Sequence, residues 1–210
     1  MTMSLDAATR VILIRHGETD WNADTRIQGQ LDIPLNARGR EQAQRLADAL
    51  AGETIDQIYA SDLQRARATA EAVGATRGQP VLLERALRER AFGSFEGLSW
   101  AEIEERFPQD SARWRAREAD FAPGGGERLA DFYARSVSTV TRLAALHPGQ
   151  SLVIVAHGGV LDCVYRAAQR LDLDAKRSWA LGNACINRLL FTDEGFSLIG
   201  WNDDNHLGVA

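Results

Sequence analysis

The fold of this chain is decided by the stretch Val11-Ile12-Leu13-Ile14-Arg15-His16-Gly17-Glu18-Thr19. Its first four residues form an unbroken apolar run, which is typical of a strand that is buried on both faces in the middle of a mostly parallel sheet. The run ends in a cation, an imidazole and a glycine. Because such sheets bind ligands at the carboxyl ends of their strands, we predict a ligand site where this strand ends.

The same pattern returns late in the chain, at Leu152-Val153-Ile154-Val155-Ala156-His157-Gly158-Gly159. This is again an apolar run that delivers a histidine and a glycine to its carboxyl end. If the two strands are parallel neighbours, His16 and His157 lie side by side at one edge of the sheet.

Apolar periodicity and capping residues predict further helices and strands between and after these two strands. We expect strands at 55–60, 81–83, 185–191 and 196–201, and helices from the Asn36 cap to Gly52, from the Ser61-Asp62 cap pair to Val73, from Ser99 to Phe107-Pro108, and at 111–118, 129–144 and 160–170.

Such alternation of strands and helices predicts an α/β fold, namely a three-layer α/β/α sandwich with a mostly parallel central sheet. A length of 210 residues with 45% hydrophobic residues favours a single domain, 1–210. Residues 1–9 are expected to be a frayed N-terminus. Residues 92–126 fit no strand of the sheet, so we expect an insertion that covers the functional edge.

The composition excludes several classes of partner. A net charge of −5 argues against binding to nucleic acid or to an anionic membrane surface. No apolar run approaches the length of a membrane span. The two cysteines, Cys163 and Cys185, fit neither a metal-binding spacing nor a disulfide framework, so a cytoplasmic protein is expected.

Polar side chains from four connections are expected to converge at the carboxyl edge of the sheet. Guanidinium groups bind phosphate through paired hydrogen bonds, and several of them in one pocket would repel a divalent metal. A neutral histidine is a competent nucleophile toward phosphorus, and nearby arginines keep it neutral by lowering its pKa. We therefore predict a phosphate site without metal or cofactor, in which His16 is the better placed histidine. The expected members are Arg15, His16, Arg65, Glu89 and His157, with Asn22 and Arg67 nearby.

These residues also resemble a known family. The run from Arg15 to Thr19, followed by Asn22 and Gln28-Gly29, looks like the first motif of the histidine phosphatase superfamily, in its phosphoglycerate mutase-like group. Further resemblances are those of 61–70 to the second arginine motif, of 87–90 with Gly93 and Gly97 to the acid motif, and of 156–159 to the second histidine motif.

The resemblance implies a role for each matching residue. His16 would carry the phosphoryl group, and Glu89 would donate a proton to the leaving oxygen. The phosphoryl group in transfer would be held by Arg15, Arg65 and His157. The substrate pocket would be lined by Gly17, Asn22, Gln28, Gly29, Arg67 and Gly158, although Arg67 could equally lie on a solvated helix face and Glu18 could merely orient the loop.

The resemblance leaves two activities open. Phosphoglycerate mutases of the family carry Tyr, Lys and an Arg pair in the cover, where this chain has Phe92, Trp100 and Arg115-Ala116. These departures favour a phosphomonoester phosphatase acting on a small phosphorylated metabolite. A 2,3-bisphosphoglycerate-dependent phosphoglycerate mutase is the alternative, because Arg113, Arg115 and Arg117 could compensate, and a non-catalytic phosphate-binding protein is a third. The oligomeric state, monomer or homodimer, is open.

Overall fold

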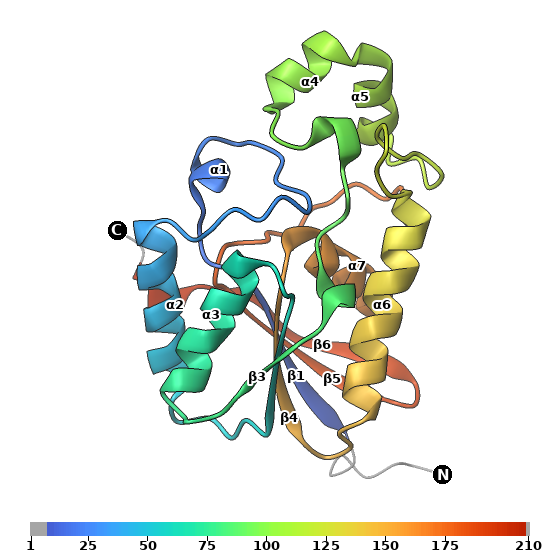
Figure 1. The fold of residues 1–210 in the computed structure, drawn as a ribbon. Helices are drawn as coiled ribbons and strands as arrows, with labels where there is room; N and C mark the ends of the chain where they lie inside the picture. Colours follow the sequence, from blue (N-terminus) through green and yellow to red (C-terminus); the bar gives the residue numbers. More distant parts are fainter. Residues whose placement is uncertain (1–7, 209–210) are drawn as a thin grey trace.

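The computed structural model describes residues 8–208, which are built around a six-stranded sheet (Figure 1). The strand order is β3-β2-β4-β1-β5-β6. Strands β1, β4, β2 and β3 pair in parallel, whereas β5 is antiparallel to both β1 and β6. The mostly parallel sheet is therefore confirmed. The strands are β1 (Thr9–Arg15), β2 (Gln57–Ala60), β3 (Val81–Leu83), β4 (Ser151–Ala156), β5 (Ile186–Thr192) and β6 (Gly195–Asp203).

Helices cover both faces of the sheet, with α2 and α3 on one side and α6 and α7 on the other (Figure 1). The helices are α1 (Asp20–Ala23), α2 (Ala37–Leu50), α3 (Gln64–Ala75), α4 (Trp100–Arg106), α5 (Pro108–Arg115), α6 (Leu129–Ala145) and α7 (Gly158–Gln169), with 3-10 turns at Arg85–Leu87, Gly93–Phe95 and Asn205–Leu207. Within residues 8–208, none of these helices is long and apolar enough to cross a membrane.

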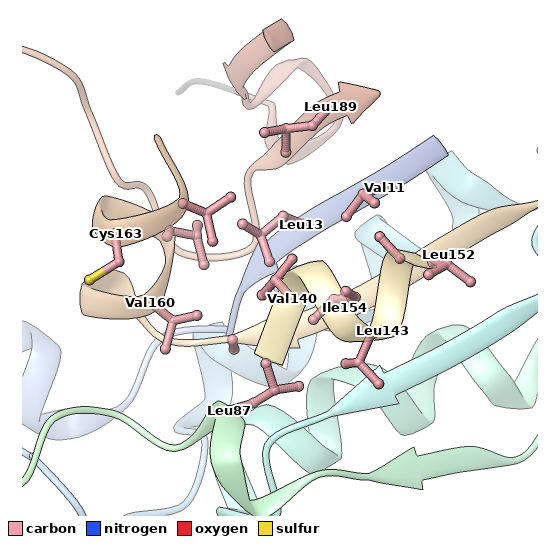
Figure 2. Packing of buried hydrophobic residues seen from close by; sticks show 14 of the residues in the cluster. Val11, Leu13, Leu87, Val140, Leu143, Leu152, Ile154, Val160, Cys163 and Leu189 are labelled. Carbon is pink, nitrogen blue, oxygen red and sulfur yellow. The ribbon is translucent and has the colours of Figure 1, made fainter. Parts of the chain in front are cut away.

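Alternate residues of β1 enter different cores. Ile12 and Ile14 belong to a cluster with α2 and α3, whereas Val11 and Leu13 pack against α6 and α7. Figure 2 shows the second cluster, in which Leu13 lies close to residues of β4 and α6. All four side chains are at most 4% exposed, which explains why the strand is apolar without interruption. The three-layer sandwich is confirmed.

The structure corrects the expected frayed N-terminus at its last two residues. Residues 1–7 lie outside the described residues, but Ala8 and Thr9 are buried and Thr9 begins β1. The Thr9 hydroxyl is 2.9 Å from each of two carbonyl oxygens, those of Ala144 and His147, at the end of α6. The strand is thus fixed to its neighbouring helix from its first residue.

The start of α3 also differs from the prediction, because neither Ser61 nor Asp62 caps it. The N-cap is Leu63, which makes no side-chain capping bond. Instead, Asp32 accepts a hydrogen bond of 2.7 Å from the backbone N–H of Gln64. Asp62 is therefore available to pair with Arg88 at 2.7 Å. A cap supplied from a distant loop leaves no local sequence signal.

Residues between β3 and α6 form a small apolar cluster of their own around Phe95, Ile103 and Phe121. Helix α4 begins at a capping box on Ser99, as expected. Helix α5 begins at Pro108 rather than at residue 111, because proline is well suited to the first helical position. In Figure 1, α4 and α5 lie beyond one end of the sheet, which is the end at which β1 and β4 finish.

Helix α2 approaches the loop after β1 so closely that it needs glycine. A Cβ on Gly17 would lie 2.5 Å from the carbonyl oxygen of Gly39, and a Cβ on Gly39 would collide with the backbone of Glu18. We expect Gly39→Ala to lower the free energy of unfolding by about 1–3 kcal/mol, although the same change in an unhindered helix gains up to ~1 kcal/mol. Urea unfolding measures this difference.

Gly52, just after α2, is the matched control, because a Cβ there meets nothing within 4 Å. Gly52→Ala should leave the urea midpoint almost unchanged. Equal stability of the two variants would show that α2 does not need this close approach.

Candidate active site

The two histidines meet because β1 and β4 are parallel neighbours in register. Arg15 pairs with Ala156, so the next residue on each strand is a histidine at the same edge. The backbone N–H of His16 donates to the carbonyl of Ala156 at 3.0 Å, and the two imidazole ring centroids are 5.2 Å apart. Both side chains are buried. The predicted juxtaposition is therefore present.

The ring of His16 is held in one tautomer. Its Nδ1 lies 2.7 Å from the carbonyl oxygen of Gly17, and a carbonyl can only accept, so Nδ1 carries the proton. Nε2 is left with a free lone pair. Burial lowers the pKa of His16 well below its usual range, and the charges of Arg65 and Arg15 lower it further. The imidazole is therefore neutral, with Nε2 as its nucleophilic atom.

Two arginines, the buried Arg65 and the partly buried Arg15, flank this imidazole, and each keeps an unpaired donor. Arg15 donates to the carbonyl of Leu181 at 2.6 Å, and Arg65 donates at 2.8 Å to each of two carbonyls, those of Leu31 and Gly29. The Nε atoms of both guanidinium groups are buried without a partner in the described part of the chain. Burial lowers the pKa of Arg65 to about 10, so it stays charged at neutral pH. Unpaired buried donors on two cations are suited to an anion.

His157 lies at the start of α7, and its ring is oriented by Ser61. Its Nε2 is 2.8 Å from the Ser61 hydroxyl, which also accepts from the backbone N–H of Leu63 at 3.4 Å. The described residues offer the hydroxyl hydrogen of Ser61 no other acceptor, so we assign it to Nε2, which leaves the ring proton on Nδ1. That Nδ1 is buried and has no partner among residues 8–208. Burial and then Arg65 lower the pKa of His157, so the site offers a second neutral imidazole, with an N–H to donate.

Glu89 enters from the segment that follows β3. One carboxylate oxygen accepts from the backbone N–H of Arg90 at 2.8 Å, and the other accepts from Gly159 at 3.0 Å. A Cβ on Gly159 would collide with this carboxylate, which explains the second glycine after His157. Glu89 and Arg15 line the same cavity of about 390 Å³, so an acid and a cation share one compartment.

Among the predicted pocket-lining residues, Gly17, Gly29 and Gly158 lie next to His16, Arg65 and Arg15, respectively. Gln28 is buried, and its side-chain oxygen has no partner among the described residues. Gly29 adopts a positive φ of 54° and presents its carbonyl to Arg65. Asn22 accepts from the backbone of Thr19 at 3.1 Å. The carbonyl oxygen of Gly17 accepts the hydrogen bond from Nδ1 of His16, and Gly158 is the first residue of α7, beside Arg15.

Arg67 is not part of this group, contrary to the prediction. Its side chain is 53% exposed and pairs with Glu71 at 2.7 Å. Arg65 and Arg67 are separated by about 200° around a helix, so only one of them can face the pocket. Glu18 also points elsewhere, because it accepts from Asn36 at 3.0 Å and pairs with Arg38 at 3.6 Å.

Sequence reasoning missed two residues that support the histidines. Ser61 orients His157, and Asn183 donates to the carbonyl oxygen of His16 at 2.9 Å. Asn183 also contacts the side-chain oxygen of Asn22 at 3.3 Å. Ser61 directly follows β2, as His16 follows β1, and that position could have identified it. Asn183 lies in an irregular segment between α7 and β5 that carries no such signal.

The donor set of this site is poor in metal ligands. Within the described ranges, no group of three or more His, Cys, Asp or Glu side chains could hold a metal ion. The positive charge comes from guanidinium groups, which compete with a cation for the same place.

Comparisons with known proteins agree with this geometry. The chain is 38% identical to phosphoglycerate mutase-like protein 4 of Arabidopsis thaliana, over 94% of this chain and 86% of the relative. It is 36% identical to the metal-independent phosphoserine phosphatase of Arabidopsis thaliana, over 95% and 83% of the two chains. The solved structure of Bacillus stearothermophilus YhfR superposes with a TM-score of 0.89 at 33% identity, covering 96% of this chain and all of that one. Residues 11–204 match the histidine phosphatase superfamily (branch 1). The chain therefore belongs to the histidine phosphatase superfamily.

Proposed function

We propose that this protein is a phosphomonoester phosphatase that transfers the phosphoryl group of a small phosphorylated metabolite to His16 and then to water. The observation that carries the proposal is the state of His16, whose Nδ1 is bound to the Gly17 carbonyl while Nε2 is free beside two cations. The relative named a metal-independent phosphoserine phosphatase supports hydrolysis by this scaffold.

In the first step, the phosphate binds to the unpaired donors of Arg15, Arg65 and His157. Nε2 of His16 attacks phosphorus, the bond from phosphorus to the ester oxygen breaks, and Glu89 gives that oxygen a proton. The arginines and the His157 N–H stabilise the charge on the oxygens in transfer. The alcohol leaves, and His16 holds the phosphoryl group.

In the second step, water replaces the alcohol. Glu89, now a carboxylate, accepts a proton from the water while the water oxygen attacks phosphorus. The bond to Nε2 breaks, inorganic phosphate leaves, and Glu89 regains its proton. Both oxygens of Glu89 accept backbone N–H groups, which fixes the carboxyl group for proton transfer in both directions.

The cover favours hydrolysis over the mutase alternative. Arg113 pairs with Glu118 at 2.7 Å, and Arg115 pairs with Glu104. Neither residue lines the cavity, and Phe92 and Trp114 face it instead. Arg113 and Arg115 are therefore poorly placed to bind the second charged group of a bisphosphate, and Arg117, which does line the cavity, is paired with Asp162 at 2.9 Å. This arrangement supports a phosphatase.

We also propose that the protein acts in the cytoplasm, as a monomer or homodimer. Cys163 and Cys185 are both free and buried, which suits a reducing compartment. We further propose that the chain forms one domain, in which residues 92–126 cover the site. The family match over residues 11–204 supports a single domain.

His16→Ala should abolish turnover, because the other neutral imidazole, that of His157, has its Nε2 hydrogen-bonded to Ser61. Rapid quench with ³²P-labelled substrate should trap acid-labile, base-stable phosphate on the wild type and none on the variant. Thermal melting checks that the variant is folded. Label on His157 or Cys163 would contradict the assignment.

Glu89→Gln should slow the hydrolysis of alkyl phosphates far more than that of p-nitrophenyl phosphate, whose leaving group departs as a stable anion. A general acid contributes about 10²–10⁴-fold, so the gap should be of that order. Because an amide also disturbs one backbone hydrogen bond of Glu89, the informative quantity is the ratio of kcat/KM values for the two substrates. Equal losses would make Glu89 a positioning residue.

Activity should survive excess EDTA, since Arg15 and Arg65 supply the positive charge that a metal would supply elsewhere. The measurement is phosphate release before and after dialysis against the chelator. Loss of turnover that a divalent ion restores would favour a metal-dependent hydrolase.

A further inference from the structure

The cavity that Arg15 and Glu89 line also contains apolar and cationic side chains. The apolar ones come from the cover and α6, with Phe92, Trp114 and Phe132. The segment between α7 and β5 contributes Arg177 and Trp179. At about 390 Å³, the cavity suits a small ester and lies near the lower end of the usual size of ligand pockets.

Most cations of this cavity are already engaged. Arg90 donates to the carbonyls of Glu127 and Phe121 at 2.9 and 2.6 Å. Arg117 pairs with Asp162 at 2.9 Å and also donates to the carbonyl of Leu173. These guanidinium groups hold the cavity wall together, so they have little capacity left for a substrate.

Arg177 differs from these arginines. Arg177 is exposed and, among residues 8–208, has neither a hydrogen-bond nor an ion-pair partner, yet it lines the cavity. It lies close enough to Arg15 for its charge to lower the pKa of that residue, although burial is the larger cause and Glu89 opposes both. An unpaired cation thus lines the same cavity as Arg15 and Glu89.

The wall beside Arg177 is fixed by aromatic packing. Trp179 stacks on Tyr165 with ring centroids 4.2 Å apart, and the guanidinium of Arg166 lies 4.8 Å from the Trp179 ring. The buried indole N–H of Trp179 has no partner in the described part of the chain. This segment therefore carries the unpaired guanidinium of Arg177 and, two residues later, the unpaired indole N–H of Trp179, whose ring is fixed by its stacking on Tyr165.

We propose that Arg177 is a specificity-determining residue that selects phosphomonoesters whose alcohol part joins an apolar or aromatic body to a carboxylate. The apolar body lies against Phe92, Trp114 and Phe132, and the carboxylate is held by Arg177. The inference rests on the proposed function for the position of the phosphate. It goes beyond that function by naming the chemical class of the leaving alcohol. The cation that selects this alcohol lies in the segment after α7 and not in the cover.

The test uses two phosphonates that cannot be hydrolysed, so binding is measured whether or not the enzyme turns them over. 4-(Phosphonomethyl)benzoate and benzylphosphonate differ only in the carboxylate. Calorimetry gives the Kd of each for the wild type and for Arg177→Gln, Arg177→Glu and Lys176→Gln. Lys176 is the matched control, because it is the neighbouring exposed cation and does not line the cavity.

The wild type should bind the benzoate compound about 5–10-fold more tightly, a value between those of an exposed ion pair and a desolvated one. Arg177→Gln should bring the ratio of Kd values close to one, Arg177→Glu should invert it, and Lys176→Gln should keep it. The preference should weaken at high salt. The attraction of every cation for the phosphonate is common to both compounds and cancels in the ratio.

Retention of the preference in Arg177→Gln, its absence in the wild type, or failure of both compounds to bind would overturn the inference. Turnover of benzyl phosphate by the wild type is measured separately. If the carboxylate preference depends on Arg177 but no phosphate is released, the proposed hydrolysis fails and the assignment of Arg177 stands.

Discussion

The structure depends on the parallel pairing of β1 with β4, because this pairing is what brings two histidines to one edge. Each strand is buried on both faces. If one strand shifted by one residue along the other, all of its side chains would move to the opposite core, where they do not fit. The register that satisfies both cores places Arg15 opposite Ala156 and hence His16 beside His157. Packing of the two cores thus fixes the chemistry at the strand ends.

The partners of the buried arginines determine what the site can bind. Arg15 and Arg65 are held by backbone carbonyls, which orient a guanidinium without neutralising it. By contrast, Arg88 pairs with Asp62 at 2.7 Å, and the aspartate balances its charge. The site therefore keeps a concentrated positive charge that suits an anion such as phosphate. The same charge adds to burial, which is the larger cause, in lowering the pKa of both imidazoles.

The sequence predicted the site residues that directly follow buried strands, but it missed the residues whose role depends on contacts with distant parts of the chain. The apolar runs of β1 and β4 predict where their histidines lie, because each histidine follows directly after a buried strand and parallel strands end at the same edge of the sheet. Arg67 was assigned to the pocket although helical geometry separates it from Arg65, and α3 was given a local cap although Asp32 supplies it from a loop. Asn183 contacts His16 across 167 residues of chain, and no local pattern records such a contact.

Among the contacts that join the loop after β1 to the cover is the carboxylate of Glu96, which accepts from the backbone N–H groups of Gln30 and Phe92 at 3.1 and 2.9 Å. Gln30 in turn donates its side-chain amide to the carbonyl of Glu89 at 3.1 Å. Gly29 presents its carbonyl to Arg65 and leaves room for Glu96, since a Cβ there would collide with that carboxylate. Arg65 and Glu89 therefore share one hydrogen-bonded support. A shift of the cover would therefore displace both Arg65 and Glu89, so the positions of these two side chains are coupled.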